Sequence, residues 1–369
     1  MHLSTPDGSA AAAANGKRLK FLLHCFSATG HVLPMQAVAR ELVERGHEVV
    51  WTTIAPQESR VVASGAKFFP AEEVVKVDAN LDGANPKDMN ETAEVMFSGR
   101  VTAQVADIRR VLKTFEPDFV LNDALPQGVA ALYELGEIPR PFLHIQASCP
   151  SLEFQKGPEP ILPQVQYVGP LVTRLAGANL GVPTWWEDVV NATSVIGITQ
   201  GTFAMNPTSL IIPAIQALQG DKRHLLVVPS KCAEEIRGNI TVEDNVCIAE
   251  WVPYDMLLPR CRLLVTNGGY GSVTQALSHG VPLVCAGTSE DKKDTAARVT
   301  WVGAGIDLKT DTPSVDQVRD AVHRVLNEDS YRENATRIGK ELNAQGGAKK
   351  ACDLLEKAAI ELGAEMTSP

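Results

Sequence analysis

Two side chains in the first third of the chain are of the types needed for proton transfer. His31 follows residues 18–24, a short apolar segment, and Asp123 follows a second apolar segment, residues 119–121. An imidazole accepts a proton near neutral pH, and a carboxylate at its other ring nitrogen stabilises the imidazolium. The same residues could instead serve structure, with His31 capping or packing in a helix and Asp123 capping a helix over residues 128–135. Both interpretations stay open at this level.

A glycine turn in the second half of the chain has the composition of an anion-binding site. Residues 263–265 form an apolar run typical of a buried strand, and helical spacing begins at Val273. The turn between them contains Asn267, Gly268, Gly269, Gly271 and Ser272. Unpaired N–H groups at a helix start attract phosphate, and Ser272 could add a hydroxyl donor. The alternative is an ordinary tight turn that glycine merely permits.

Parallel strands and helices are needed to position these residues. Residues 18–24, 31–42 and 48–53 predict a strand, a helix and a strand, and the same order returns from residue 195 onward. This order predicts a parallel sheet with helices on its faces, whose ligands bind beyond the carboxyl ends of the strands. We therefore expect an α/β fold of two doubly wound Rossmann-like domains that face each other across a cleft.

The length of 369 residues suits two domains of roughly 150 residues each. Residues 149–183 are rich in proline and glycine and mark the connection between them, while residues 55–99 are polar and rich in turn formers and predict a long surface excursion. We expect a disordered N-terminal segment over residues 1–17, a first domain over 18–150 and a connection over 151–192. A second domain over 193–346 and a final helix with a tail over 347–369 follow.

Composition argues against several classes of protein. The chain has 34 basic and 44 acidic residues, a net charge of −10 and no basic block, which argues against a nucleic-acid partner. No apolar run reaches the roughly 18 residues of a membrane span, and residues 1–16 lack the apolar core of a signal peptide. The seven cysteines occur singly and the histidines show no metal-ligand spacing. We expect a cytoplasmic protein without a metal.

Four short motifs together resemble the family 1 glycosyltransferases of GT-B fold. They are Gly30-His31-x-x-Pro34, Trp251-x-Pro253, Gly268-Gly269-x-Gly271-Ser272 and Gly280-Val281-Pro282. The resemblance covers residues 18–357 and implies an inverting, metal-independent transfer of a sugar, with glucose expected, from a UDP-sugar to a hydroxyl of a small lipophilic acceptor. The UDP-sugar is a co-substrate, and no cofactor is implied.

The resemblance also assigns roles to individual residues. It makes His31 the catalytic base and Asp123 its partner, with a shortened acceptor-binding domain over residues 18–150 and a nucleotide-sugar-binding domain over residues 193–346. Trp251 would stack on uracil. The implied donor-binding residues are Thr202, Trp251, Val252, Asn267, Gly268, Gly269, Gly271, Ser272, Gln275, Asp291 and Lys292.

The chain departs from the family pattern at several of these positions. Asn267 stands where plant members place a histidine on the diphosphate, and Gln275 stands where they place a glutamate on the ribose. Asp291 and Lys292 replace an Asp-Gln pair at the sugar, although their charged surroundings would also fit a solvated loop. Residues 148–169 are several dozen residues shorter than in family members. The alternative function is therefore a catalytically impaired nucleotide-sugar-binding homologue. An NAD-dependent oxidoreductase ranks last, because Thr274 replaces the third glycine of the dinucleotide fingerprint.

Overall fold

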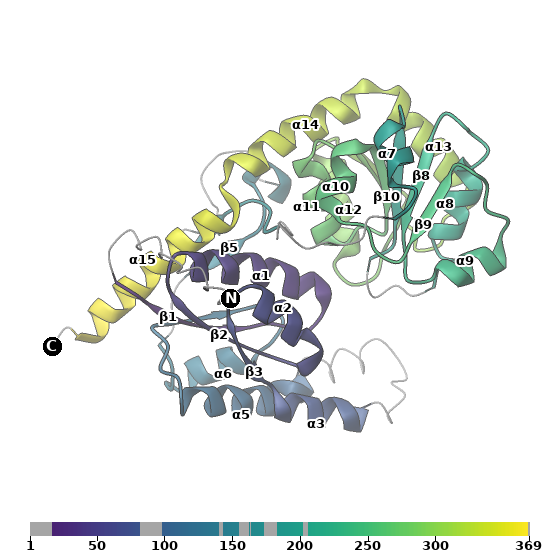
Figure 1. The fold of residues 1–369 in the computed structure, drawn as a ribbon. Coiled ribbons are helices and arrows are strands. Elements are labelled where there is room, and N and C mark those ends of the chain that lie inside the picture. Colours follow the sequence, from purple (N-terminus) through teal and green to yellow (C-terminus); the bar gives the residue numbers. More distant parts are fainter. Residues whose placement is uncertain are drawn as a thin grey trace, which may run out of the picture. The chain divides into compact units, whose positions relative to one another are not determined.

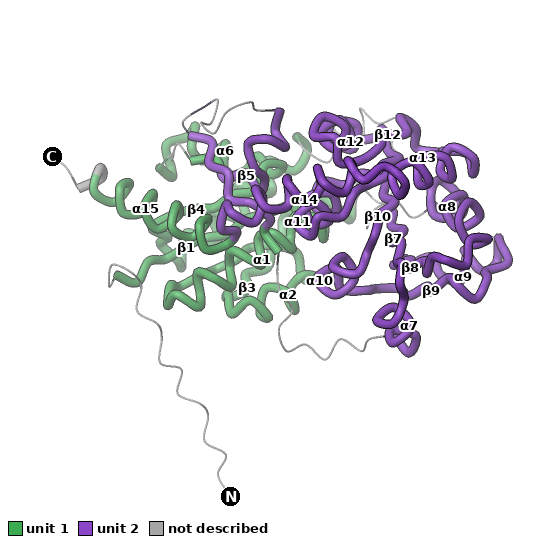
Figure 2. Tube along the Cα trace, turned by 90° about the horizontal axis from the view of Figure 1, so that it is seen from above, with its two compact units in different colours: residues 1–144, 171–173, 348–369 green, residues 145–170, 174–347 purple. Residues whose placement is uncertain are grey.

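The computed structural model describes residues 17–81, 98–139, 143–154, 162, 164–172, 183–201 and 206–367. The chain forms two compact units (Figure 2). Unit 1 comprises Met1–His144, Leu171–Thr173 and Ala348–Pro369, and unit 2 comprises Ile145–Pro170 and Arg174–Gly347. The predicted disordered segment, apart from Lys17, lies outside the described residues.

Unit 1 is built on a four-stranded parallel sheet with the strand order β3-β2-β1-β4. Its strands are β1 (Lys20–His24), β2 (Glu48–Thr53), β3 (Lys67–Pro70) and β4 (Phe119–Asn122). The helices are α1 (Thr29–Glu44), α2 (Glu58–Ala63), α3 (Glu72–Leu81), α5 (Val101–Leu112) and α6 (Gly128–Glu134). Helices α1 and α2 lie on one face of the sheet and α3, α5 and α6 on the other (Figure 1). Two covered faces explain why β1 is a continuous apolar run, whose Phe21, Leu22 and Leu23 are fully buried.

The prediction that residues 55–99 form a long surface excursion is wrong for the first half of this range. This part holds α2, β3 and α3, and β3 extends the sheet by pairing with β2, with Phe68 opposite Trp51. The start of α3 is fixed from another element, because the carboxylate of Asp107 on α5 accepts the backbone N–H groups of Glu72, Glu73 and Val74 at 2.9–3.0 Å. Such long-range partners leave no local pattern. Residues 82–97 lie outside the described residues.

Unit 2 is built on a six-stranded parallel sheet with the strand order β12-β11-β10-β7-β8-β9. Its strands are β7 (Val195–Thr199), β8 (Leu225–Pro229), β9 (Val246–Ala249), β10 (Cys261–Thr266), β11 (Leu283–Cys285) and β12 (Gly305–Asp307). The helices are α7 (Trp186–Asn191), α8 (Ile211–Leu218), α9 (Ala233–Asn239), α10 (Tyr254–Leu257), α11 (Tyr270–Ser278), α12 (Lys292–Trp301), α13 (Val315–Asn327) and α14 (Asp329–Ala344). Separate apolar cores fill the two faces of the sheet. The predicted α/β fold with two Rossmann-like units is confirmed.

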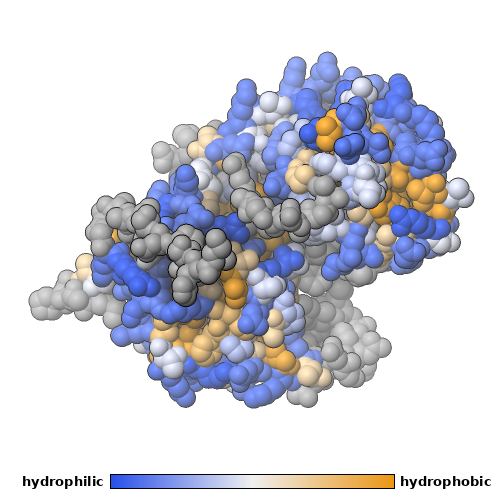
Figure 3. All heavy atoms as spheres, in the orientation of Figure 1, coloured by the Kyte–Doolittle hydropathy of each residue, from blue (hydrophilic) through white to orange (hydrophobic). Residues whose placement is uncertain are grey.

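Apolar side chains are largely withdrawn from the surface into these cores. In the view of Figure 3, hydrophilic residues cover most of the visible face outside the grey residues, and apolar residues form smaller patches. Trp251 is one of the few large apolar side chains that stay exposed in the described part of the chain. An exposed tryptophan is a candidate for stacking on a ligand.

Residues 145–170, which we expected in the first domain and the connection, pack with unit 2. They include most of β5 (His144–Gln146), η3 (Pro150–Glu153) and β6 (Val165–Tyr167). The carboxylate of Glu153 accepts hydrogen bonds from Nε of Arg298 at 2.9 Å and from the hydroxyl of Tyr270 at 2.8 Å. This segment is therefore held against the starts and flanks of α11 and α12.

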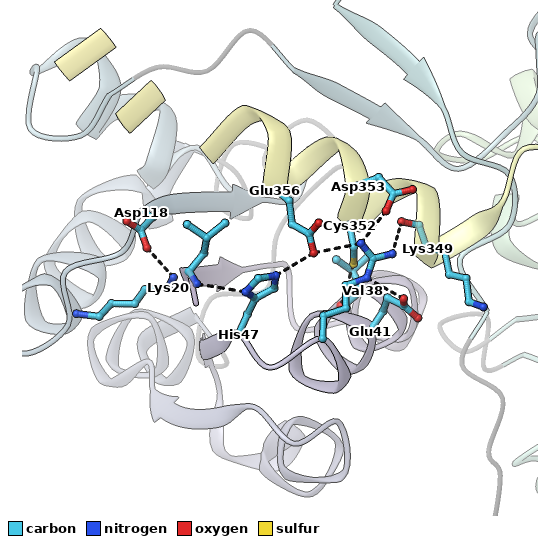
Figure 4. A network of polar contacts seen from close by, with 11 residues as sticks. Lys20, Val38, Glu41, His47, Asp118, Lys349, Cys352, Asp353 and Glu356 are labelled. Carbon is cyan, nitrogen blue, oxygen red and sulfur yellow. Dashed lines mark hydrogen bonds and ion pairs between the residues drawn. The ribbon is translucent and has the colours of Figure 1, made fainter. Parts of the chain in front are cut away.

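The final helix, α15 (Gly347–Thr367), confirms the helix predicted over residues 347–362 and packs on unit 1 from residue 348 (Figure 4). Arg45 at the end of α1 binds Asp353 at 2.7 Å and Glu356 at 3.1 Å. The buried His47 binds Glu356 through Nε2 at 2.9 Å and accepts the N–H of Leu19 at Nδ1 at 3.2 Å. The last helix is therefore joined to the end of α1 and, through His47, to the residue that precedes β1.

Candidate functional site

His31 lies in the first turn of α1, where the sequence placed it at the junction of turn and helix. Its backbone N–H donates to the carbonyl of Ala28, the N-cap residue, at 2.9 Å. Its ring makes no helix-capping bond. Instead, Nδ1 lies 2.7 Å from Oδ2 of Asp123, and the edge of the ring faces Phe26 at a centroid distance of 5.4 Å. The ring is thus held by contacts outside its own helix.

Asp123 directly follows β4, and its carboxylate is bound on both oxygens. Oδ2 accepts from His31 and from the N–H of Phe26 at 3.2 Å, and Oδ1 accepts from the N–H of Ala124 at 2.7 Å. Burial by itself would raise the pKa of this carboxyl, but the hydrogen bond and charge of His31 and the two backbone donors outweigh it and lower the pKa. The N-cap residue of α6 is Gln127, and the bonds of the Asp123 carboxylate go to Phe26, His31 and Ala124, so the capping role considered for Asp123 is excluded.

The ionised carboxylate decides the tautomer of His31. A carboxylate only accepts hydrogen bonds, so Nδ1 of His31 must carry the proton that points at Asp123. The other ring nitrogen, Nε2, is then the proton acceptor, and the ring is about one third exposed. A hydroxyl that reaches Nε2 can lose its proton there, and Asp123 stabilises the imidazolium that forms.

A second polar pair beneath this dyad was missed by the sequence reasoning. His24 and Asn122 are the last residues of the neighbouring strands β1 and β4, and His24 Nδ1 lies 2.8 Å from Asn122 Oδ1. Two polar residues that end adjacent predicted strands, one of them next to Asp123, were a signal that could have revealed them.

In unit 2 the glycine turn connects β10 to α11 and leaves backbone donors at the helix start. Gly268 has a φ of +85°, which other residues rarely adopt, and Gly269 is the N-cap residue without a side-chain cap. The N–H groups of Ser272 and Val273 donate to the carbonyl of Gly269 at 3.0 and 3.1 Å. The N–H groups of Tyr270 and Gly271 have no acceptor within the helix, so the turn can receive an anion.

Asn267 is 7% exposed and ties two strand ends together. Its Nδ2 atom donates to the carbonyl of Gln200 at 2.6 Å, just after β7, while Oδ1 has no hydrogen-bond partner among the described residues. Gly287, beyond β11, presses on the same turn, since a Cβ there would collide with the carbonyl oxygen of Asn267 and lie 2.9 Å from Cδ of Lys292. Gly287 was not among the predicted site residues, although it is the first glycine after a predicted strand.

The residues around Trp251 divide between surface and core. Trp251 is 42% exposed, which excludes a buried tryptophan beside a turn, whereas the side chain of Val252 is fully buried. Only the backbone of Val252 could therefore touch a ligand. Tyr254, in the first turn of α10, donates its hydroxyl to Oγ1 of Thr199 at 2.9 Å. Burial raises the pKa of Tyr254, and hydrogen bonds to Thr199 and Ser272 partly oppose this.

The predicted sugar-binding residues differ in their surroundings. Gln275 donates its Nε2 atom to the carbonyl of Gly271 at 3.0 Å, and Asp291 is an exposed N-cap residue of α12. Lys292 is only 9% exposed, and its Nζ binds Glu290 and Oγ of Ser289. The alternative of a solvated charged loop is thus wrong for Lys292. Thr202 lies outside the described residues, and the donor-binding roles of all these residues stay predictions.

Within the described ranges, no group of three or more His, Cys, Asp and Glu side chains has an arrangement that could hold a metal ion. Every helix in those ranges is too short or too polar to cross a lipid bilayer.

Comparison with known proteins gives consistent matches. The model of the erythromycin biosynthesis protein CIII-like C-terminal domain matches residues 215–356. The chain is 31% identical over 417 residues to 4'-demethylrebeccamycin synthase of Lentzea aerocolonigenes, covering 89% of this chain and 96% of that protein. It is 35% identical over 216 residues to UDP-glucosyltransferase A1 of Starmerella bombicola, covering 58% of this chain and 46% of that protein. The chain thus spans about half the length of this second relative.

Solved structures extend the likeness to the whole architecture. The glycosyltransferase of kitacinnamycin superposes with a TM-score of 0.76 over 93% of this chain and 99% of that chain. The identity is 20%, so this likeness shows the GT-B fold alone.

Proposed function

The chain belongs to the family 1 glycosyltransferases, and we propose that it transfers glucose from UDP-glucose to a hydroxyl of a small lipophilic acceptor with inversion at the anomeric carbon. Its relatives include proteins named UDP-glucosyltransferase and 4'-demethylrebeccamycin synthase, which supports both a nucleotide-sugar donor and a natural-product acceptor. The observation that carries the proposal is the 2.7 Å contact between His31 Nδ1 and Asp123 Oδ2.

The proposed reaction is a single displacement that uses this dyad as its base. Nε2 of His31 takes the proton of the acceptor hydroxyl, and the oxygen forms a bond to the anomeric carbon. The bond from that carbon to the diphosphate oxygen breaks, and its electron pair leaves with UDP. Because attack and departure are on opposite faces, the configuration inverts. Asp123 stays ionised throughout and stabilises the imidazolium.

The leaving diphosphate gains negative charge as this bond breaks. In this proposal the N–H groups of Tyr270 and Gly271 and the positive end of α11 stabilise that charge, so the step needs no metal. Exposed Trp251 stacks on uracil, and the hydroxyl of Ser272 adds a donor. Unlike histidine, Asn267 brings no charge to the site.

The test is a mass-spectrometric transfer assay with UDP-glucose and a panel of phenolic, terpenoid, polyketide and sterol acceptors. We expect a hexose adduct from the parent protein, and its loss in His31→Ala and Asp123→Asn. The matched control is His224→Ala, because the ring of His224 also has polar partners, Ser194 at 2.7 Å and Asp221 at 3.7 Å, but lies before the amino end of β8, whereas the candidate site residues follow the carboxyl ends of strands.

Two outcomes would decide against the proposal. If His31→Ala still forms product, His31 is not the catalytic base. If the parent makes no adduct from any UDP-sugar but binds UDP in calorimetry, the chain is a nucleotide-sugar-binding homologue.

A further inference from the structure

The polar pair beneath the dyad has a defined hydrogen-bond arrangement. Asn122 Nδ2 lies 2.7 Å from the carbonyl oxygen of Asp123 and 2.8 Å from that of Pro126. Both partners only accept, so the amide orientation of Asn122 is fixed and its Oδ1 must face His24. Oδ1 in turn only accepts, so Nδ1 of His24 carries a proton and donates it. Every polar atom of the Asn122 side chain therefore has a partner.

The same pair holds the backbone of Asp123 from both sides. The N–H of Asp123 donates to the carbonyl of His24 at 3.0 Å, and its carbonyl accepts from Asn122 Nδ2 at 2.7 Å. The two peptide groups that flank the Asp123 Cα atom are thus tied to the ends of β1 and β4. The direction of the carboxylate follows from the position of that Cα atom.

We propose that Asn122, oriented by His24, is a positioning residue that sets the Asp123 carboxylate and through it the ring of the base His31. This inference rests on the proposed function. The polar atoms of the Asn122 side chain bind other protein groups, and Asn122 acts through Asp123, because a displacement of the reacting groups by about 1 Å can cost roughly a hundredfold in rate.

His24 suits this task because it stays uncharged. Burial lowers its pKa, and the bond to Asn122 and the nearby carboxylates of Asp123 and Asp107 oppose this only in part. A neutral His24 orients the amide of Asn122 without becoming a second cation beside Asp123. It is also 5% exposed, so water does not replace its hydrogen bond.

The role of His24 and Asn122 can be tested with variants that remove or restore their hydrogen bonds. His24→Leu removes the donor to Asn122, whereas His24→Asn places an amide N–H at the same number of bonds from the backbone as Nδ1. Asn122→Asp keeps the shape but lacks the donor to the carbonyls of Asp123 and Pro126, and Asn122→Ala removes all contacts. The matched control is Asn245→Ala in unit 2, because Asn245 Nδ2 also donates to two backbone carbonyls, those of Asp221 and His224.

We expect kcat to fall about tenfold to a hundredfold in His24→Leu, Asn122→Asp and Asn122→Ala, with KM for UDP-glucose unchanged within about twofold. His24→Asn should recover most of kcat. Asn245→Ala should lose stability without losing kcat. The inference is overturned if His24→Leu and His24→Asn have equal kcat, or if Asn122→Asp keeps the kcat of the parent.

A spectroscopic measurement separates this inference from the proposed function. In the full chain labelled with ¹⁵N-histidine, NMR should show His31 protonated at Nδ1 in the parent and in His24→Asn. In His24→Leu and Asn122→Asp the Nδ1–H signal should shift or exchange faster with water. If no acceptor yields product, the proposed function fails while this readout still tests the positioning role. An unchanged His31 signal in both variants would refute that role.

Discussion

The hydroxyl of Tyr270 lies 2.8 Å from Oε1 of Glu153, 117 residues earlier in the chain. Tyr270 is the first residue of α11, and its backbone N–H is one of the two donors that the helix start leaves free. Gln146 also donates to this hydroxyl at 2.9 Å, and Arg298 binds the other oxygen of Glu153. The segment after β5 therefore braces the helix start that we propose binds the diphosphate.

Tyr270→Phe should weaken UDP binding about three- to tenfold, the equivalent of about 1 kcal/mol for one net hydrogen bond. The variant removes the contacts of the hydroxyl but leaves Glu153 paired with Arg298. Calorimetric titration with UDP measures the effect. Tyr133→Phe is the control, since its hydroxyl donates to the carbonyl of Val120 in unit 1. An unchanged Kd in Tyr270→Phe would show that the brace does not support the donor site.

Trp251→Ala should weaken UDP binding by about 1–3 kcal/mol, because stacking of an aromatic side chain on a base contributes that much. The affinity of Trp251→Phe for UDP should lie between those of the parent and the alanine variant. The matched control is Trp301→Ala, because Trp301 is a second exposed tryptophan of the same unit, whose ring makes an edge-to-face contact with Phe154 instead. Equal losses in Trp251→Ala and Trp301→Ala would speak against specific stacking on uracil.

Gly287→Ala should destabilise unit 2 by about 1–3 kcal/mol through overpacking and should also weaken UDP binding. The added methyl group collides with the carbonyl of Asn267, and this displaces the glycine turn. Gly238→Ala in α9 is the control, because nothing lies within 4 Å of a Cβ there, and it should stabilise the protein by up to about 1 kcal/mol. Denaturant unfolding and UDP titration measure the two effects. A Gly287→Ala variant with the stability and Kd of the parent would contradict the close approach.

Glu356→Ala should lower the free energy of unfolding by about 1–3 kcal/mol, because it leaves the buried Nε2–H of His47 without an acceptor. Arg45 also loses one of its carboxylate partners. The affinity for UDP should not change, since these contacts belong to unit 1. Glu361→Ala, which breaks the exposed pair with Lys357 on the same helix, should change stability by no more than about 0.5 kcal/mol. Similar losses of unfolding free energy in Glu356→Ala and Glu361→Ala would show that the buried contacts of α15 contribute little to stability.

His24 should make stability depend on pH below about 6.5, the pKa of an unperturbed histidine. Burial lowers its pKa in the folded state, so between the folded and unfolded values the unfolded chain binds more protons. Folding stability therefore falls as pH drops from about 7 toward 5. Thermal melts of the parent and His24→Asn over this range should show a steeper fall in the parent. If the stability of the parent and of His24→Asn fell equally over this pH range, burial would not hold His24 neutral.

The sequence by itself determined the glycine turn and most of the strands, although not β3, β6 or β12. Residues 48–53 and 195–199 are recognisable because a strand buried on both faces is mostly apolar, and the turn before α11 is recognisable because Gly268, with a φ of +85°, adopts a backbone conformation that favours glycine. His31 and Asp123 were candidates because both follow apolar strands, and ligands bind at that edge of a parallel sheet. These features are local, so a single stretch of chain reveals them.

Only the tertiary structure decided which candidates meet. The 2.7 Å contact of His31 with Asp123 joins residues 92 positions apart, and Glu356 reaches His47 across 309 positions. The same holds for Asp107, whose carboxylate caps α3 in a region that looks like a loop in sequence, and for His24 with Asn122. Side-chain hydrogen bonds of this kind depend on strand order and register, which no local pattern of residue types encodes.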